Sequence, residues 1–300
     1  MKSVFLTEKR GCLETRNYDV FFDIVIYLLL ILLTAFCLYP IWYVLIASFT
    51  DSTELVKNPG LLLWPTKFVT NAYKLVFENP LFINSFMNSV KIIVVGLPIN
   101  IVMTLLCGYF MSCTGMMWKR QVNFLIMFTM FFSGGLIPGY LNIKSLGIYN
   151  TIWALILPSA LNVYNAIICK TAIEAVPESL KESAYIDGAN DFQVIFKIIF
   201  PLIKPTLAVL LLYYGVGHWN SWFSASIYIK DNAKLPVQNI LRSILLANQD
   251  LLGSNSDSYD AYAETIKYAA IVISTFPILC VYPFLQKYFA KGVMIGAVKG

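Results

Sequence analysis

Six long apolar runs restrict this chain to the architectures that a lipid bilayer permits. A bilayer core about 30 Å thick is crossed by roughly 20 apolar residues in a helix. Runs of that length predict an all-α, polytopic membrane protein with six transmembrane helices. Composition agrees, because 58% hydrophobic and 13% charged residues are too apolar for soluble domains of this length. The runs are 23–49, 88–112, 122–141, 151–173, 202–223 and 262–289.

Glycine and proline interrupt several of the runs. Helices there are expected to be kinked, with neighbouring helices satisfying the freed backbone groups. The interruptions are Gly134, Gly135 and Pro138 in the third run, Pro158 in the fourth, Pro205 in the fifth, and Pro277 and Pro283 in the sixth.

Basic residues indicate the orientation in the membrane. With the amino terminus inside, thirteen Lys and Arg residues fall on the inner side and seven on the outer side, which favours two cytoplasmic termini. The first run is longer than a signal-peptide core, so we interpret it as an uncleaved helix. The predicted organisation is a cytoplasmic segment 1–22, a transmembrane domain 23–289 with outer loops 50–87 and 224–261, and a cytoplasmic tail 290–300.

The net charge of +5 therefore reflects topology rather than a partner. No basic stripe with interleaved aromatics points to nucleic acid. The six cysteines contain no CxxC pair, so neither a disulfide framework nor a metal site is indicated.

A polar break between the fourth and fifth runs, residues 174–201, carries the signals of two short helices. Pro177 suits a first helical turn, and Glu178 there complements the helix dipole. Gly188 is placed to end this first helix in a left-handed conformation. The break is thus predicted to begin as one arm of a cytoplasmic elbow.

The second arm is predicted to start at Asn190, because Gln193 three residues later completes the pattern of a capping box. Pro201 is expected to stop it. The small residues Ser183 and Ala184 of the first arm are interpreted as room for the backbone of another protein. An apolar stripe at helical spacing marks the second arm, formed by Phe192, Ile195, Phe196 and Ile199.

Two interpretations of the elbow stay open from the residues alone. The pair of helices could lie on the membrane surface, or it could enter a groove of a soluble protein. Surface helices usually carry Lys and Arg on their polar face, which attract anionic lipid. This segment is acidic instead, which favours the protein groove; its carboxylates are Glu174, Glu178, Glu182, Asp187 and Asp191.

The elbow also resembles the signature of ABC importer permeases, which is E-A-A, three residues, G, nine residues, I-x-L-P. Here it reads Glu182-Ser183-Ala184, Gly188, Ile198 and Phe200-Pro201, with Ser and Phe as departures. The resemblance implies that the elbow is the coupling helix that sits in a cleft of an ATP-hydrolysing subunit. The residues it implies for ATPase coupling are Glu182, Ser183, Ala184, Asp187, Gly188, Ile198 and Pro201.

The rest of the chain resembles carbohydrate importer permeases, on stretches such as Trp219 to Phe223 and Leu235 to Gln238. Its shape is similar to the second membrane subunit of maltose-type systems, and within these to the LplC/YtcP branch associated with oligosaccharides and polysaccharide fragments. That resemblance implies a bacterial cell membrane, a second permease subunit, two ATPase subunits or domains, and an extracytoplasmic sugar-binding protein. It also implies that the tail 291–300 reaches the ATPases and that part of loop 224–261 engages the binding protein.

The chain itself is expected to be no enzyme. It lacks a GxxxxGK[ST] loop, so ATP and Mg belong to the partner subunits and no cofactor is expected here. The alternative function is an ion- or proton-coupled secondary transporter. That class needs ionisable residues in mid-span, whereas the acidic residues cluster at span ends and loops.

A candidate substrate path lies near the outer half of the fifth run. Sugars need aromatic faces and paired hydrogen-bonding groups inside the bundle. Two structural roles stay open beside sugar binding, because Trp and Tyr also form belts at membrane interfaces and an amide also joins helices. A catalytic role for the single histidine is disfavoured. The candidate residues are Tyr214, His218, Trp219, Asn220 and Trp222.

Overall fold

The apolar runs fold as helices, since each backbone group in lipid must find its partner within the segment. The computed structural model describes residues 2–57, 60–114, 117–246, 264–281 and 283, and within them every regular element is helical. The longer helices are α1 (Lys2–Ala47), α3 (Asn71–Glu78), α4 (Pro80–Ser112), α5 (Lys119–Phe131), α6 (Leu136–Ser145), α8 (Val163–Glu174), α9 (Glu178–Ile186), α12 (Lys204–Trp219), α14 (Val237–Leu245) and an unlabelled helix Glu264–Val281.

Short helical pieces connect these elements. They are α2 (Ser52–Lys57), α7 (Trp153–Ile156), η1 (Leu157–Ser159), α10 (Asp191–Gln193), η2 (Val194–Ile199), α11 (Phe200–Leu202), α13 (Phe223–Tyr228) and η3 (Asn232–Lys234). Of these, η2 is a π-helix, whereas η1 and η3 are 3₁₀ helices.

Three described helices are long and apolar enough to cross a membrane on their own, by length and composition. They are Phe22–Ala47 within α1, Pro80–Ser112 and Glu264–Val281. Three further pairs pass the same test when each bent pair is taken as one span, which allows up to six spans. The all-helical prediction is confirmed for the described residues. The helix α4 begins at Pro80, eight residues before the predicted start of the second span.

The bends fall at the predicted glycine and proline positions. Helices α5 and α6 meet at 112°, with Gly135 at φ 87° between them. The piece Trp153–Ser159 and α8 meet at 49° just after Pro158, and the piece Asp191–Leu202 meets α12 at 87° before Pro205. Glu264–Val281 continues through Pro277 as one helix. A single proline removes one hydrogen bond, which a helix in lipid tolerates.

The chain divides into two compact units, one of residues 1–73 and 256–272 and the other of 74–255 and 273–300. In the first unit, the end of α1 is fixed by hydroxyl bonds: Ser48 Oγ lies 2.7 Å from Tyr73 Oη, and Ser52 Oγ lies 2.8 Å from Thr265 Oγ1. The most apolar window of α1 has no buried residue, so this surface is left for lipid or another chain. Helix α1 also runs without a break across the predicted boundary at residues 22 and 23.

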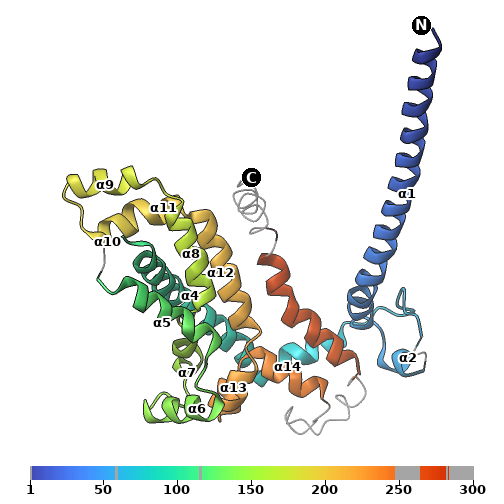
Figure 1. Ribbon diagram of the computed structural model, residues 1–300. Helices are drawn as coiled ribbons and strands as arrows, with labels where there is room; N and C mark the ends of the chain where they lie inside the picture. The colour runs from blue at the N-terminus through green and yellow to red at the C-terminus, as the bar shows by residue number, and fades with distance from the viewer. Residues whose placement is uncertain (1, 58–59, 115–116, 247–263, 282, 284–300) are drawn as a thin grey trace. The chain divides into compact units, whose positions relative to one another are not determined.

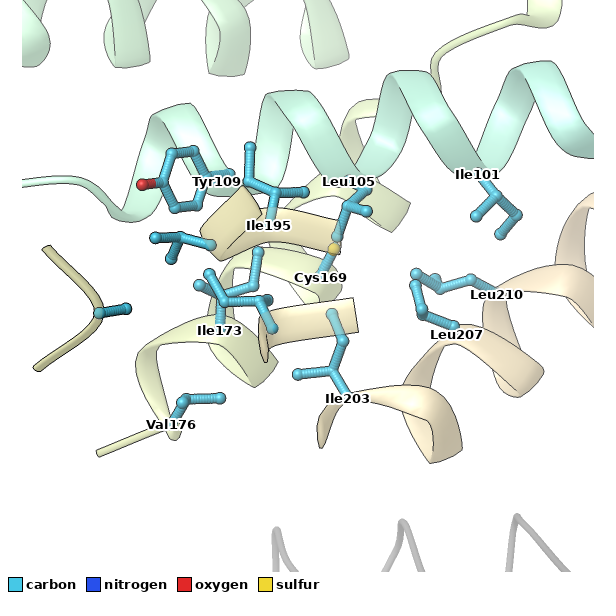
Figure 2. Packing of buried hydrophobic residues seen from close by; sticks show 13 residues of the cluster. Ile101, Leu105, Tyr109, Cys169, Ile173, Val176, Ile195, Ile203, Leu207 and Leu210 are labelled. Atoms are coloured by element: carbon cyan, nitrogen blue, oxygen red, sulfur yellow. The ribbon is translucent and has the colours of Figure 1, made fainter. Parts of the chain in front are cut away.

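The second unit packs α8 and α12 against α4 (Figure 1). The elbow α9–α11 lies at one end of this bundle, and α6, α7 and α13 lie at the other. Figure 2 shows the core between them, where Leu105 of α4 meets Cys169 of α8 and Ile195 of the elbow. Gly108 permits the close approach, since a Cβ there would lie 3.0 Å from both Cβ and Sγ of Cys169. The elbow is therefore built into the hydrophobic core of the unit.

Candidate functional site

The first arm of the elbow is α9, and its end has the geometry expected of Gly188. The φ of Gly188 is 81°, a left-handed conformation. Its N–H donates to the carbonyl of Tyr185 at 3.0 Å, and the N–H of Ala189 donates to the carbonyl of Ala184 at 2.9 Å. These two bonds make a Schellman motif, which satisfies the last carbonyls of the helix. No atom lies within 4 Å of a Cβ placed at Gly188, so backbone conformation and not space requires glycine within this chain.

The second arm starts with the expected capping box. Asn190 Oδ1 accepts from the Gln193 N–H at 2.9 Å, and Gln193 Oε1 accepts from the Asn190 N–H at 3.0 Å. The expectation that Pro201 ends this arm is wrong, since the helical chain runs to Leu202. The π-helix η2 explains this. The Phe200 N–H donates to the carbonyl of Ile195, five residues back, so the helix has already changed its hydrogen-bond register when it reaches Pro201, which has no N–H to donate.

Burial of the elbow's side chains does not follow the apolar stripe that the sequence shows. Glu182, Ser183 and Asp187 are exposed, as a docking surface requires. Ala184 is only 8% exposed and packs into the core of the bundle, so its small size serves this chain rather than another backbone. The stripe is split as well: Ile195 and Ile199 are buried, whereas Phe192 and Phe196 are exposed, and Ile198 is partly buried.

Three side chains meet where the elbow joins α4, and no sequence signal pointed to this cluster. Asp191 Oδ1 lies 2.7 Å from Tyr185 Oη and 3.0 Å from Tyr109 Oη, and the two hydroxyls lie 2.6 Å apart. Partial burial raises the pKa of Tyr185, so its hydroxyl stays protonated. The cluster joins both arms to the end of α4.

The candidate substrate path is only partly assembled. A cavity of about 920 Å³ lies beside the bend between Trp153–Ser159 and α8, here called the break in span four. Of the five residues predicted for the path, only Tyr214 and His218 line this cavity. Trp219 is buried and donates its indole N–H to the carbonyl of Ser274 at 3.0 Å. Asn220 is exposed at the end of α12, and Trp222 stacks beneath Arg242, with the guanidinium carbon 3.8 Å from the ring centroid.

Polar side chains on and beside α8 and α12 complete the lining of the cavity. They come from two separate segments of the chain, 159–165 and 213–221, which only folding brings together. They are Ser159, Asn162, Tyr164, Asn165, Tyr213 and Ser221. An aromatic ring beside amides and hydroxyls is the mixture that a sugar needs.

Tyr214 and His218 also hold helices together. Tyr214 Oη lies 2.6 Å from Thr104 Oγ1 and accepts from the Asn162 N–H at 3.0 Å. His218 Nε2 lies 2.8 Å from Asn100 Oδ1. The space for this ring comes from Gly96, where a Cβ would lie 2.9 Å from Nε2. Helix–helix bonding, one of the two structural roles left open by the sequence, thus accounts for part of the polarity.

Asn100 donates hydrogen bonds to backbone carbonyls at the break in span four. It is fully buried, and its Nδ2 donates to the carbonyls of Ser159 at 2.7 Å and Ala160 at 3.1 Å. With both amide protons used, Oδ1 must be the acceptor, so His218 carries its proton on Nε2. One side chain therefore compensates for hydrogen bonds that the break at Pro158 removes.

Replacing Asn100 by leucine is expected to destabilise the folded chain. The two carbonyls and the His218 N–H lose their partner, which costs about 1–3 kcal/mol. Thermal unfolding of the purified chain in detergent measures this as a lower Tm. Asn123→Leu is the control, since Asn123 Oδ1 is buried and has no partner in the described chain, and its Tm should hold or rise. Equal losses in both variants would contradict the role given to Asn100.

Comparisons with known proteins agree with this architecture. The family model described as binding-protein-dependent transport system inner membrane component matches residues 11–295. The chain is 40% identical to the polygalacturonan/rhamnogalacturonan transport system permease protein YtcP of Bacillus subtilis, covering 93% of this chain and 98% of that protein. It is 42% identical to protein LplC of the same organism, covering 89% and 90%.

A solved structure is similar over nearly the same length. It is the crystal structure of a bacterial ABC transporter involved in the import of the acidic polysaccharide alginate, matched with a TM-score of 0.84 and 31% identity over 90% of this chain and 97% of that one. With a family match that spans nearly the whole sequence, this chain belongs to the inner membrane components of binding-protein-dependent transport systems, which are multi-pass membrane permeases of ABC transporters.

Proposed function

We propose that this chain is one of two different permease subunits of an ATP-driven importer, and that its elbow couples transport to a separate ATPase. The elbow carries this proposal: two capped arms are fixed into the core, while Glu182, Asp187 and Gly188 stay exposed at one end of the bundle. Family membership supports it over ion or proton coupling. The proposed coupling residues remain Glu182, Ser183, Ala184, Asp187, Gly188, Ile198 and Pro201, with Ala184 acting from the inner face.

The proposed topology has six spans, both termini in the cytoplasm and the elbow on the cytoplasmic side. The bent pairs α5–α6 and Trp153–Ser159 with α8, together with α12, supply the spans beyond the three straight ones. We retain the division into 1–22, 23–289 and 290–300, although the tail lies outside the described residues. The loop 224–261 is assigned to the outer side, where α13 and α14 would face the binding protein; its part from 247 also lies outside the described residues.

In this mechanism ATP binds the two partner ATPases and closes them, and the elbow moves with them. The spans then change between inward-open and outward-open states. A nearly complete change of population requires a differential affinity of about 5.5 kcal/mol between the two states. This chain supplies no catalytic group and no cofactor in that scheme; it converts movement at the elbow into access to a path.

The proposed cargo is a fragment of a polysaccharide. The relative named for polygalacturonan and rhamnogalacturonan and the alginate importer both support acidic sugar polymers as its source. Within this chain, the cavity beside span four offers Tyr213 and two amides, Asn162 and Asn165, for contact with a passing sugar. Of the five residues that the sequence predicts for the substrate path, Tyr214 and His218 remain part of this proposal.

Uptake by the assembled transporter tests this function. The permease pair, its ATPases and the binding protein are reconstituted in liposomes and supplied with galacturonate or alginate oligosaccharides. ATP-dependent uptake is expected for one of them. Tyr213→Ala should reduce uptake by about tenfold, because a stacking surface is lost. Tyr27→Ala, a change at an exposed position of α1, is the control and should leave uptake unchanged. Uptake that follows an ion gradient without ATP would contradict the proposal.

A further inference from the structure

We propose that Tyr109, Tyr185 and Asp191, here called the Tyr–Asp link, pass movement of the elbow to helix α4. They are positioning residues, and the inference rests on the proposed coupling function. Tyr185 lies on the first arm, Asp191 starts the second, and Tyr109 lies near the end of α4. The link is thus the place where both arms are bonded to one span.

The chemistry of the link makes it specific. Three oxygen pairs are within hydrogen-bonding distance, but the two hydroxyls supply only two protons. Either both tyrosines donate to Asp191, or one tyrosine donates to the other, which then donates to Asp191. At least one tyrosine donates to the carboxylate in every arrangement, and a hydrogen bond to a carboxylate is about twice as strong as a neutral one. The two arms and α4 are therefore joined through at least one charge-assisted bond.

Asp191 is not required for capping the second arm. Asn190 and Gln193 already cap its start through the two bonds of the capping box. The carboxylate of Asp191 is thereby left for the two tyrosines. Its position at the start of a helix explains a negative charge there, but not two bonds to hydroxyls of other elements.

Helix α4 can carry the movement from the link to the cavity. Tyr109 is 8% exposed and belongs to the hydrophobic core, so it cannot move without its helix. Along the same helix, Thr104 bonds to Tyr214, and Asn100 bonds to His218 and to the break in span four. Tyr214 and His218 line the cavity. A continuous set of contacts thus joins the elbow to the proposed path.

The test uses the reconstituted transporter and measures sugar transported per ATP hydrolysed. The probe is galacturonate oligosaccharide, or alginate oligosaccharide if that sugar stimulates the native complex. Tyr109→Phe keeps the ring in the core and removes the bond to the elbow. We expect transport per ATP to fall about tenfold, the effect of losing roughly one bond to a charged group, while assembly is retained.

Further variants separate linkage from simple loss of stability. Asp191→Ala should also lower transport per ATP, and Asp191→Asn should restore part of it, since its amide oxygen still accepts. Tyr185→Phe tests the same link from the exposed elbow side, and the Tyr109→Phe and Asp191→Ala changes together should be no worse than the stronger one alone. Asn190→Ala is the control, because it weakens the second arm without touching the link, and its ratio should stay native.

The outcomes distinguish the link from the function on which it rests. If the native complex couples ATP to uptake and Tyr109→Phe and Asp191→Ala keep its ratio, the link is overturned and the proposed function stands. Transport and ATP hydrolysis that fall together at an unchanged ratio overturn it as well. If the native complex hydrolyses no ATP in response to a loaded binding protein, the proposed function fails and the link fails with it.

Discussion

Gly188→Arg is expected to abolish the stimulation of ATP hydrolysis by the loaded binding protein. Within this chain the change is mild: a left-handed φ costs a non-glycine residue roughly 1–2 kcal/mol, and no atom stands within 4 Å of the new Cβ. The exposed turn is the proposed contact with the ATPase, where a long cationic side chain would hold the two subunits apart. ATP hydrolysis by the reconstituted complex and co-purification of the ATPase measure the effect.

Gly147→Arg provides a matched control. Gly147 also has a left-handed φ, 70°, and open space around its Cβ position, but it follows α6 at the other end of the bundle. The same backbone strain should therefore leave stimulated hydrolysis and assembly intact. A Gly188→Arg complex with native stimulation, or an equal loss in Gly147→Arg, would contradict the coupling role of the elbow. Glu182→Lys should reproduce the loss by reversing one exposed charge.

The second large effect is expected at Gly108, where α4 and α8 approach each other closely. In Gly108→Ala, the new Cβ would lie 3.0 Å from Cys169 Cβ and 3.1 Å from the backbone nitrogen of Lys170. Backbone cannot move aside as a flexible side chain can, and overpacking a tight contact costs about 1–3 kcal/mol. Thermal unfolding in detergent should show a lower Tm, with a larger fall for Gly108→Leu.

Gly215→Ala is the control for this packing contact. Gly215 lies inside α12, and the nearest atoms to its Cβ position are the Leu97 methyls at 3.9 Å, an ordinary contact. Alanine there should stabilise the helix by about 0.5–1 kcal/mol, because it restricts the unfolded chain. The two Gly→Ala changes are thus expected to shift Tm in opposite directions. A fall of similar size in both would show that helix α4 does not depend on Gly108 for its approach to α8.

Local signals predicted the elbow well because they act between near neighbours in the sequence. The turn at Gly188 depends on one φ and on bonds within six residues, and the capping box joins Asn190 and Gln193. The proline signal failed at Pro201, since a rule for α-helices does not cover the π-helical register before it. The small size of Ala184 also misled, because it suits a buried face as well as an exposed one.

The candidate path was predicted less well for a related reason. Tyr, Trp and Asn near a membrane interface serve belts, helix packing and sugar binding alike, and the sequence does not rank these uses. Folding separated them: Trp219 bonds to Ser274, Trp222 packs on Arg242, and Tyr214 and His218 reach the cavity.

The sequence alone determined that this chain forms membrane helices, where most of those helices bend, and that a capped elbow interrupts them. Each of these follows from runs, single residues or pairs a few positions apart. Only the tertiary structure decided which polar groups meet, since Tyr109 and Asp191 are 82 residues apart and Asn100 and His218 are 118 apart. Such bonds depend on how the helices pack, because the residues around one partner in the sequence do not identify the other partner.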